Sequence, residues 1–238
     1  DEYSDSDILY VYVPSYEEMN SMASNHHQFQ YKEDGIDHIF TDIYNFLKNV
    51  LSGDSTINFE VINHPDLINT ELDFLYNMRH SFTNHKIIRS YLGMAKRDGI
   101  KISNERTDRD KNKKLNHVLR GYNFCEQILV NIFNPVIPKD SNLYNRIQEN
   151  KLLTDSRHRH EIGKTLLDAV SELRERVNKM LDDGTLGFPQ YMKDCDMAIL
   201  DTILTDKVSE WRLEFGEATY FECLKGIVYD ATANGIKY

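Results

Sequence analysis

The spacing of apolar residues along this 238-residue chain changes near residue 66. Before that point short β-forming runs alternate with one helical stretch, and beyond it apolar residues recur mainly at helical spacing. Residues 7–13 (DILYVYV) are rich in β-formers and are followed by Pro14, which is typical of a strand. Further strands are expected at 27–32, 35–40 and 57–62. This order predicts a mixed sheet with helices packed on it.

A helix is expected within this first region over residues 41–51, with Thr41 as its N-cap and Gly53 at its end. Beyond the change in spacing, helices are expected over 66–78, 83–98, 111–131, 143–151, 158–182 and 194–207. The polar stretch 99–112 is expected to be a loop, and the pattern over 208–238 fits either helix or strand. The predicted fold class is α+β. A partial nucleotidyltransferase-type sheet domain (1–78) is followed by a mainly helical domain (79–238).

Composition excludes several classes of protein. Apolar residues make up 40% of the chain, enough for a core, and no apolar run reaches the roughly 18 residues of a membrane span. No signal peptide opens the sequence. Cys125, Cys195 and Cys223 lie far apart and form neither a disulfide framework nor a zinc motif. We therefore expect a protein of the reducing cytosol that makes no contact with membranes.

Charge is strongly segregated along the chain. Residues 1–78 carry 2 basic and 15 acidic residues, and residues 79–120 carry 12 basic and 4 acidic residues. A basic segment within an acidic protein attracts an anionic group, such as phosphate, nucleic acid or the acidic segment itself. The alternative is a solvated face whose charges are paired within the protein.

Two acids stand at the start of the first expected strand. Asp5 and Asp7 are two residues apart, so in a strand they lie on one face. Two such carboxylates can hold two divalent cations, and Mg²⁺ suits an oxygen-rich site of this kind. Glu60 is the candidate third ligand, because it lies within the apolar run 57–62, where an acid requires a reason. Two alternatives stay open: the Asp pair fits a simple turn, and Glu60 could face solvent on an edge strand.

Several short motifs together resemble a known family. In order they are SDSD (4–7), VYVP (11–14), FLKNVLSGD (46–54), NFEVI (58–62), RSYLGMA (89–95) and the set Lys113, His117 and Arg120. The chain is similar over residues 4–183 to predicted nucleotidyltransferases of the DNA polymerase β superfamily, in the branch found in bacteria and phages. A Gly-Ser pair that precedes SDSD in this superfamily is absent from this sequence.

The resemblance implies an activity and a site. The reaction would transfer a nucleoside monophosphate from an NTP, ATP in particular, to an acceptor hydroxyl, with Mg²⁺ or Mn²⁺ as cofactor. Asp5 and Asp7 would bind both metals, and Glu60 would bind the metal nearest the acceptor and help to deprotonate it. RNA, a protein side chain or a small molecule is the expected acceptor, in the cytoplasm of a bacterial cell or a phage-infected host. The rival hypothesis is an inactive nucleotidyltransferase-like module that binds nucleic acid or a partner protein, and the missing Gly-Ser pair favours it.

Two helices are expected to carry basic faces. At 100° per residue, Lys113, His117 and Arg120 fall within about 60° of one another, opposite an apolar face. The resemblance implies that these three side chains bind the triphosphate, and that Lys86 and Arg89 on the preceding helix assist. An ordinary solvated helix surface is the alternative for both faces.

Overall fold

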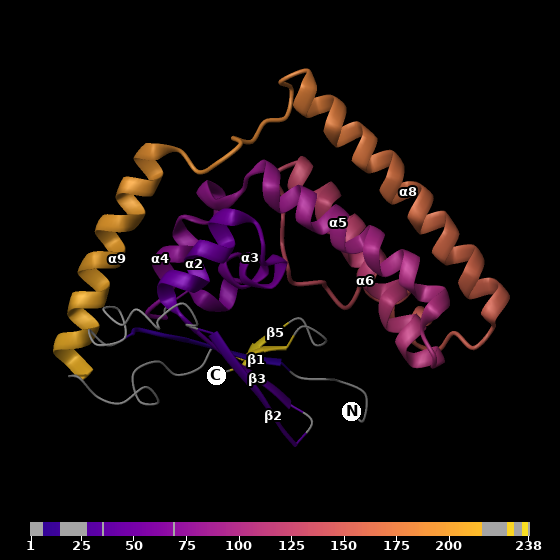
Figure 1. The fold of residues 1–238 in the computed structure, drawn as a ribbon, viewed down its shortest axis with the longest axis horizontal. Helices are drawn as coiled ribbons and strands as arrows, with labels where there is room; N and C mark the ends of the chain where they lie inside the picture. The colour runs from indigo at the N-terminus through magenta and orange to yellow at the C-terminus, as the bar shows by residue number, and fades with distance from the viewer. Residues whose placement is uncertain are drawn as a thin grey trace. The chain divides into compact units, whose positions relative to one another are not determined.

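The fold is that of a computed structural model, which describes residues 7–14, 28–34, 36–68, 70–215, 228–230 and 235–237. It is α+β, as expected, with a small mixed sheet and a predominantly helical remainder (Figure 1). The chain forms two compact units. The first takes the described residues of Asp1–Phe82 and Met192–Tyr238, and the second is Thr83–Tyr191. These units divide the chain differently from the expected domains 1–78 and 79–238, because the C-terminal part clusters with the N-terminal part.

Three strands form the sheet of the first unit. They are β1 (Asp7–Tyr12), β2 (Gln28–Glu33) and β3 (Ile36–Asp42), in the order β1-β3-β2. Strand β1 runs parallel to β3, whereas β2 runs antiparallel to it. The strands expected over 7–13, 27–32 and 35–40 are therefore confirmed.

The two faces of this sheet differ in character. Leu9, Val11 and Thr41 are buried on one face. The other face carries stacked rings, with Tyr10 on Phe40 at 4.3 Å between centroids and Tyr31 on His38 at 4.7 Å. The Tyr10 hydroxyl also lies 3.1 Å from Nδ1 of His38. Such cross-strand pairs each contribute roughly 0.2–1 kcal/mol and hold the strands in register.

Helix α2 (Ile43–Ser52) follows β3 without a loop. Its N-cap is Asp42, one residue beyond the expected Thr41, and the Asp42 carboxylate accepts a hydrogen bond from the Asn45 N–H at 2.8 Å. Gly53 ends the helix, as expected, with φ at 69°, a left-handed conformation that glycine adopts without strain. The apolar side of α2 is buried, and the helix packs on β1 and β3.

The prediction of a strand over 57–62 is wrong. These residues form helix α3 (Thr56–Ile62), and Ser55 caps it by accepting a hydrogen bond from the Asn58 N–H at 3.1 Å. Five consecutive residues, from Asn58 to Ile62, are buried. A short apolar run that is buried on every side carries no periodicity, so it fits a strand and a helix equally well.

The helix expected over 66–78 is broken into shorter pieces. Two 3₁₀ turns, Pro65–Leu67 and Arg79–Phe82, flank the short helix α4 (Asp73–Asn77). Between them the Thr70 hydroxyl donates to the Leu67 carbonyl at 2.8 Å and accepts from the Leu72 N–H at 3.2 Å. A threonine side chain that bonds neighbouring backbone groups competes with a continuous helix.

The C-terminal part of the first unit contains one long helix and a small strand pair. Helix α9 (Asp194–Phe215) extends eight residues beyond the expected end at 207, and Arg212 donates to the Pro14 carbonyl at 2.8 Å. Strands β4 (Val228–Asp230) and β5 (Gly235–Lys237) pair antiparallel, and β4 contacts β1. The ambiguous region 208–238 thus contains both kinds of element.

A pair of long helices forms the centre of the second unit. Helices α5 (His85–Lys101) and α6 (Asp108–Leu129) pack along one another and are joined by a 3₁₀ turn, Ile102–Asn104. The prediction of a loop over 99–112 is wrong, since most of these residues belong to the end of α5, the 3₁₀ turn and the start of α6. Thr107 caps α6 by accepting from the Asp110 N–H at 3.1 Å. Polar residues such as Thr and Asp are favoured at helix caps and in loops alike. The sequence pattern therefore does not distinguish a helix end from a loop.

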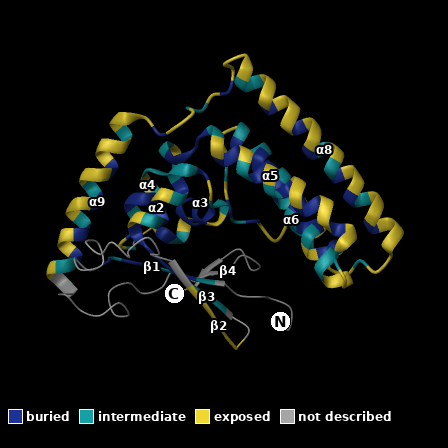
Figure 2. Ribbon diagram, viewed as in Figure 1, coloured by how far each residue is buried: buried dark blue, intermediate teal, exposed yellow. Residues whose placement is uncertain are grey.

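Helices α7 (Asn142–Lys151) and α8 (Ser156–Asp182) complete the second unit and confirm the helices expected over 143–151 and 158–182. One stripe of α8 is buried, and most of the remaining residues are exposed (Figure 2). Contact between α5 and α8 is close, because a Cβ added at Gly99 would meet the side chain of Leu167.

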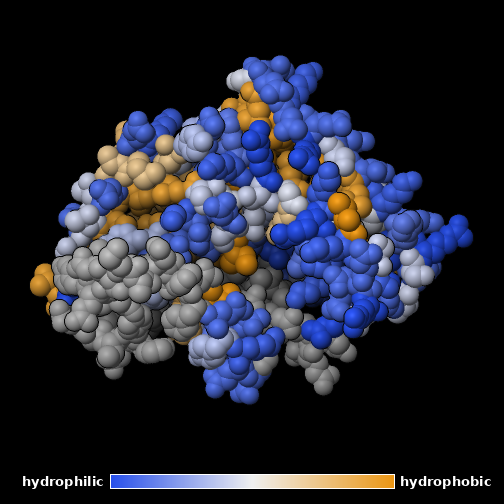
Figure 3. Space-filling model, in the orientation of Figure 1, coloured by the Kyte–Doolittle hydropathy of each residue, from blue (hydrophilic) through white to orange (hydrophobic). Residues whose placement is uncertain are grey.

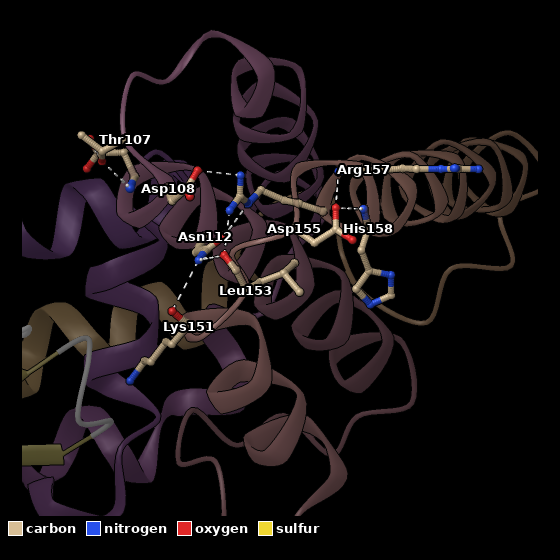
Figure 4. Close-up of polar contacts among 10 residues, drawn as sticks. Thr107, Asp108, Asn112, Lys151, Leu153, Asp155, Arg157 and His158 are labelled. Carbon is tan, nitrogen blue, oxygen red and sulfur yellow. Dashed lines mark hydrogen bonds and ion pairs between the residues drawn. The ribbon is translucent and has the colours of Figure 1, made fainter.

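A buried arginine joins α8 to the start of α6. The Arg159 guanidinium donates to Asn112 Oδ1 at 2.7 Å, to Asp108 Oδ1 at 2.9 Å and to the Leu153 carbonyl at 2.7 Å. Asn112 in turn donates to the carbonyls of Leu153 and Lys151 (Figure 4). Because Arg159 is only 2% exposed, these acceptors replace the water that its charge would otherwise require.

Candidate functional site

The first candidate site is the acidic start of the sheet. Asp5 lies outside the described residues, and Asp7 is the first residue of β1. The backbone ladder pairs Asp7 with Asp37 of β3. Paired positions on neighbouring strands are about 4.8 Å apart. An acid that was not selected in the sequence therefore lies at the position beside Asp7.

Asp37 is available to a ligand. Its side chain is 28% exposed, and its carboxylate lies 3.7 Å from the ammonium of Lys32 on β2. That ion pair is weak at this distance and exposure. One signal in the sequence could have identified Asp37: two of the expected strands each have an aspartate near the start.

Glu60 lies in a different setting from the one expected. It belongs to helix α3 and is 5% exposed. The reason for selecting it, a mid-strand position, is wrong, and its role as a metal ligand stays a prediction. Among the residues whose side chains the structure describes, no group of three His, Cys, Asp or Glu side chains is arranged to hold a metal ion. Glu60 and Asp37 are among those residues, whereas Asp5 and the side chain of Asp7 lie outside them.

The second candidate site is the basic face of α6, defined here as Lys113, His117 and Arg120. All three lie on one helix, as expected, with Lys113 exposed and the other two half-buried. The guanidinium of Arg120 lies over the ring of Phe124, 5.3 Å from its centroid. Leu115, Val118 and Leu119, which the helical spacing places on the opposite side, are buried.

Asp98 of α5 organises one end of this face, and the sequence reasoning missed it. Its buried carboxylate accepts from His117 Nδ1 at 3.0 Å and from Lys114 Nζ at 3.3 Å. Burial alone would raise the pKa of Asp98, but the His117 hydrogen bond and the Lys114 charge outweigh burial and hold that pKa below its usual value. The carboxylate is therefore ionised at neutral pH. The signal in the sequence was its spacing: Asp98 follows the buried Tyr91 and Ala95 at helical intervals, on an otherwise apolar stripe.

Lys86 and Arg89 lie near the beginning of α5, and both are exposed. The Lys86 ammonium lies 5.1 Å from the centroid of the Tyr191 ring, within the range of a cation–π contact. Beside Lys86, the ring of His85 lies 2.6 Å from the Phe188 carbonyl. These contacts tie the start of α5 to the segment that follows α8.

The two candidate sites belong to different units with opposite charge. Thr83–Tyr191 carries 20 basic and 14 acidic residues, whereas the remainder of the chain carries 8 basic and 24 acidic residues. Hydrophilic side chains cover most of the surface of α5, α6 and α8 in the view of Figure 3. The second unit is therefore the part of the chain suited to polyanions.

A cavity of about 280 Å³ also lies in the second unit. Residues of α6, α7 and α8 line it, among them Tyr122, Asn123, Arg146 and Thr165. None of the residues predicted for the site lines this cavity.

The cysteines offer no nucleophile in the described region beyond the exposed Cys195, because Cys125 is buried and burial raises the pKa of its thiol. Cys223 lies outside the described residues.

No helix among the described residues combines the length and the apolar character that crossing a membrane requires. No protein-family model, no curated protein and no solved structure matches this chain.

Proposed function

We propose that this protein is a divalent-metal-dependent nucleotidyltransferase that transfers a nucleoside monophosphate from an NTP to an acceptor hydroxyl. The observation that supports it best is the register of the sheet, which pairs Asp7 with Asp37 on adjacent parallel strands. This pairing sets a further acid, Asp37, beside Asp7. The resemblance of the SDSD segment to the DNA polymerase β superfamily implies that Asp5 and Asp7 bind metal, and Asp37 would be the third acid of that site.

The acidic residues would have distinct roles in this reaction. Asp5, Asp7 and Asp37 would hold Mg²⁺ or Mn²⁺, with Asp37 taking the place first assigned to Glu60. A bound cation would neutralise charge on the triphosphate. The acceptor oxygen would bond to the α-phosphorus while the bond to the β-phosphate oxygen breaks, so that pyrophosphate leaves and a carboxylate takes the acceptor proton. The acceptor would be RNA, a protein side chain or a small molecule.

The basic side chains would serve the nucleotide. Lys113, His117 and Arg120 would bind the triphosphate of ATP, with Lys86 and Arg89 as further cations on the same unit. Charge-assisted hydrogen bonds of this kind are about twice as strong as neutral ones. The cytoplasm of a bacterial cell or phage-infected host is the compartment that supplies ATP and Mg²⁺.

The direct test is transfer of label. The protein, together with any residues encoded upstream, is incubated with α-labelled NTPs, Mg²⁺ and cell extract, and the labelled product is identified. Asp37→Asn should abolish transfer, whereas Asp54→Asn, which changes an exposed acid of the same unit, should not. Glu60→Gln separates the two candidates for the third ligand. Equal transfer by wild type and Asp37→Asn would refute the role of Asp37, and the absence of any transfer would refute the enzyme.

A second candidate function is a non-catalytic module that binds nucleic acid. The excess of basic residues in Thr83–Tyr191 favours it, since phosphate contacts dominate non-specific affinity. Fluorescence anisotropy with labelled single-stranded RNA over a range of salt concentrations tests this function. Affinity that falls steeply with salt, in a protein that transfers no label, would establish the module in place of the enzyme.

A further inference from the structure

An acid on the buried side of a helix requires a partner, and Asp98 has charged partners on two sides. It is 3% exposed, and it follows Tyr91 and Ala95 on the stripe by which α5 packs. Both of its oxygens are used. Oδ2 accepts from His117 Nδ1, while Oδ1 faces Lys114 Nζ at 3.3 Å and Arg97 Nε at 3.7 Å.

This arrangement constrains the imidazole of His117. An ionised carboxylate is only an acceptor, so a ring nitrogen that lies 3.0 Å from it must carry a hydrogen. The histidine then has its hydrogen on Nδ1, and Nε2 is the nitrogen that remains for another group. The side chain of His117 is 34% exposed, so a ligand can reach the ring.

We propose that Asp98 is a positioning residue for the basic face of α6: it fixes the Nδ1–H form and the orientation of His117, so that Nε2 is directed to a phosphate oxygen. The inference rests on the proposed function, because that function supplies the phosphate. A phosphate oxygen only accepts hydrogen bonds, so Nε2 binds it when Nε2 is protonated as well as Nδ1, and Nε2 is then a charge-assisted donor. Lys114, held by the other carboxylate oxygen, is restrained beside it.

The proposal makes a prediction whose sign opposes simple electrostatics. A carboxylate near an anion site repels the anion, so removing its charge alone should strengthen binding. If Asp98 instead orients His117, removing the charge should weaken binding. The substitution Asp98→Asn therefore separates the two effects by direction.

The first measurement is titration of the full chain with ATP at low salt. We expect Asp98→Asn to weaken ATP binding about tenfold, the loss typical of one charge-assisted hydrogen bond. Glu126→Gln is the control, since it removes a negative charge from α6, the helix that carries His117, in a residue that pairs with Arg176 at 2.8 Å. It should leave affinity unchanged or slightly raise it. Tighter ATP binding by Asp98→Asn than by wild type would overturn the proposal.

The second measurement reads the tautomer directly and needs no nucleotide. Long-range ¹H–¹⁵N spectra distinguish Nδ1–H from Nε2–H histidines, and the signals that vanish in His117→Gln identify the residue. We expect Nδ1–H in the neutral wild-type ring. An Nε2–H form would overturn the proposal, even if Asp98→Asn failed to fold.

A double substitution shows whether Asp98 acts through His117. In a His117→Gln background, Asp98→Asn should have no further weakening effect on ATP affinity, whereas a general structural role would weaken it again. Failure of the proposed function looks different: wild type would not bind ATP at all, while His117 would still show the Nδ1–H form.

Discussion

The sheet of the first unit and the paired helices of the second unit place their charged side chains by different means. In the sheet, the backbone ladder sets Asp7 beside Asp37, so the alignment depends on two segments thirty residues apart. On α6, the helical period alone puts Lys113, His117 and Arg120 on one face, and Asp98 of α5 then holds the histidine. Acid placement is thus a property of strand pairing, whereas cation placement is largely local to one helix.

The largest expected effect tests what holds the second unit together. Arg159→Ala should lower the free energy of unfolding by about 3 kcal/mol, because it leaves the buried Oδ1 of Asn112 without its donor and removes one of the two donors to the Leu153 carbonyl. Arg157→Ala is the control on the same helix, where an 88% exposed side chain pairs with Glu161 and its loss should change stability by less than about 0.5 kcal/mol. Urea unfolding measures both. Equal losses would show that the buried contacts do not stabilise the unit.

The next test concerns the acids of the first unit. Clustered carboxylates repel when empty, so Mg²⁺ or Mn²⁺ should raise the melting temperature, with a gain of about 2.7 kcal/mol at a hundred times the dissociation constant. Asp37→Asn should remove most of this gain, and Asp54→Asn should retain it. A metal-dependent shift that survives Asp37→Asn but is lost in Glu60→Gln would restore the original choice of third ligand.

A third test asks whether the basic face binds phosphate or only faces water. Lys113→Ala should weaken ATP binding by roughly 1–3 kcal/mol and change stability by no more than about 0.5 kcal/mol. Arg120→Ala should weaken binding similarly, with an added cost of about 0.5–1 kcal/mol in stability because Arg120 lies over Phe124. Lys139→Ala, at an exposed lysine of the same unit, is the control for net charge. Calorimetric titration in which all three variants bind as tightly as wild type contradicts the phosphate role.

The smallest effect is a dependence of stability on pH. The pKa of Asp98 is lower in the folded protein than in the unfolded chain, so its contribution is fully present above about pH 4 and is lost as the pH falls through the folded value. Stability of Asp98→Asn should therefore fall less steeply than that of wild type in this acidic range. Urea midpoints measured from pH 5 to pH 3 supply the comparison, and parallel curves would remove Asp98 from the group of acids that stabilise the fold.

The sequence predicted best what depends on a local pattern. The long stripe of α8, the end of α2 at Gly53 and the shared face of Lys113, His117 and Arg120 all follow from helical period or from one glycine. Helix α3 was missed because a fully buried run has no period, and Ser55 is a helix signal only when read as a cap.

Two features of the candidate sites depend on contacts between distant segments. The pairing of Asp7 with Asp37 requires the register of β1 on β3, which is set by side chains along both strands. The contact of Asp98 with His117 requires the packing of α5 on α6. In each case the sequence carried a partial signal, an acid at the start of a strand or on an apolar stripe, but not the identity of its partner.

The stacked rings of the sheet have a consequence for the tolerance of the protein to substitution. Tyr10 and Phe40 occupy paired positions three residues along the strands from Asp7 and Asp37. The contact between their rings therefore helps to hold the two strands in the register that pairs the acids. A slip of one residue would set Asp7 opposite Ile36 or His38 instead. Replacing an aromatic residue that touches no ligand would thus weaken the alignment of the acids, and a survey of active variants would find flat side chains favoured at positions 10 and 40.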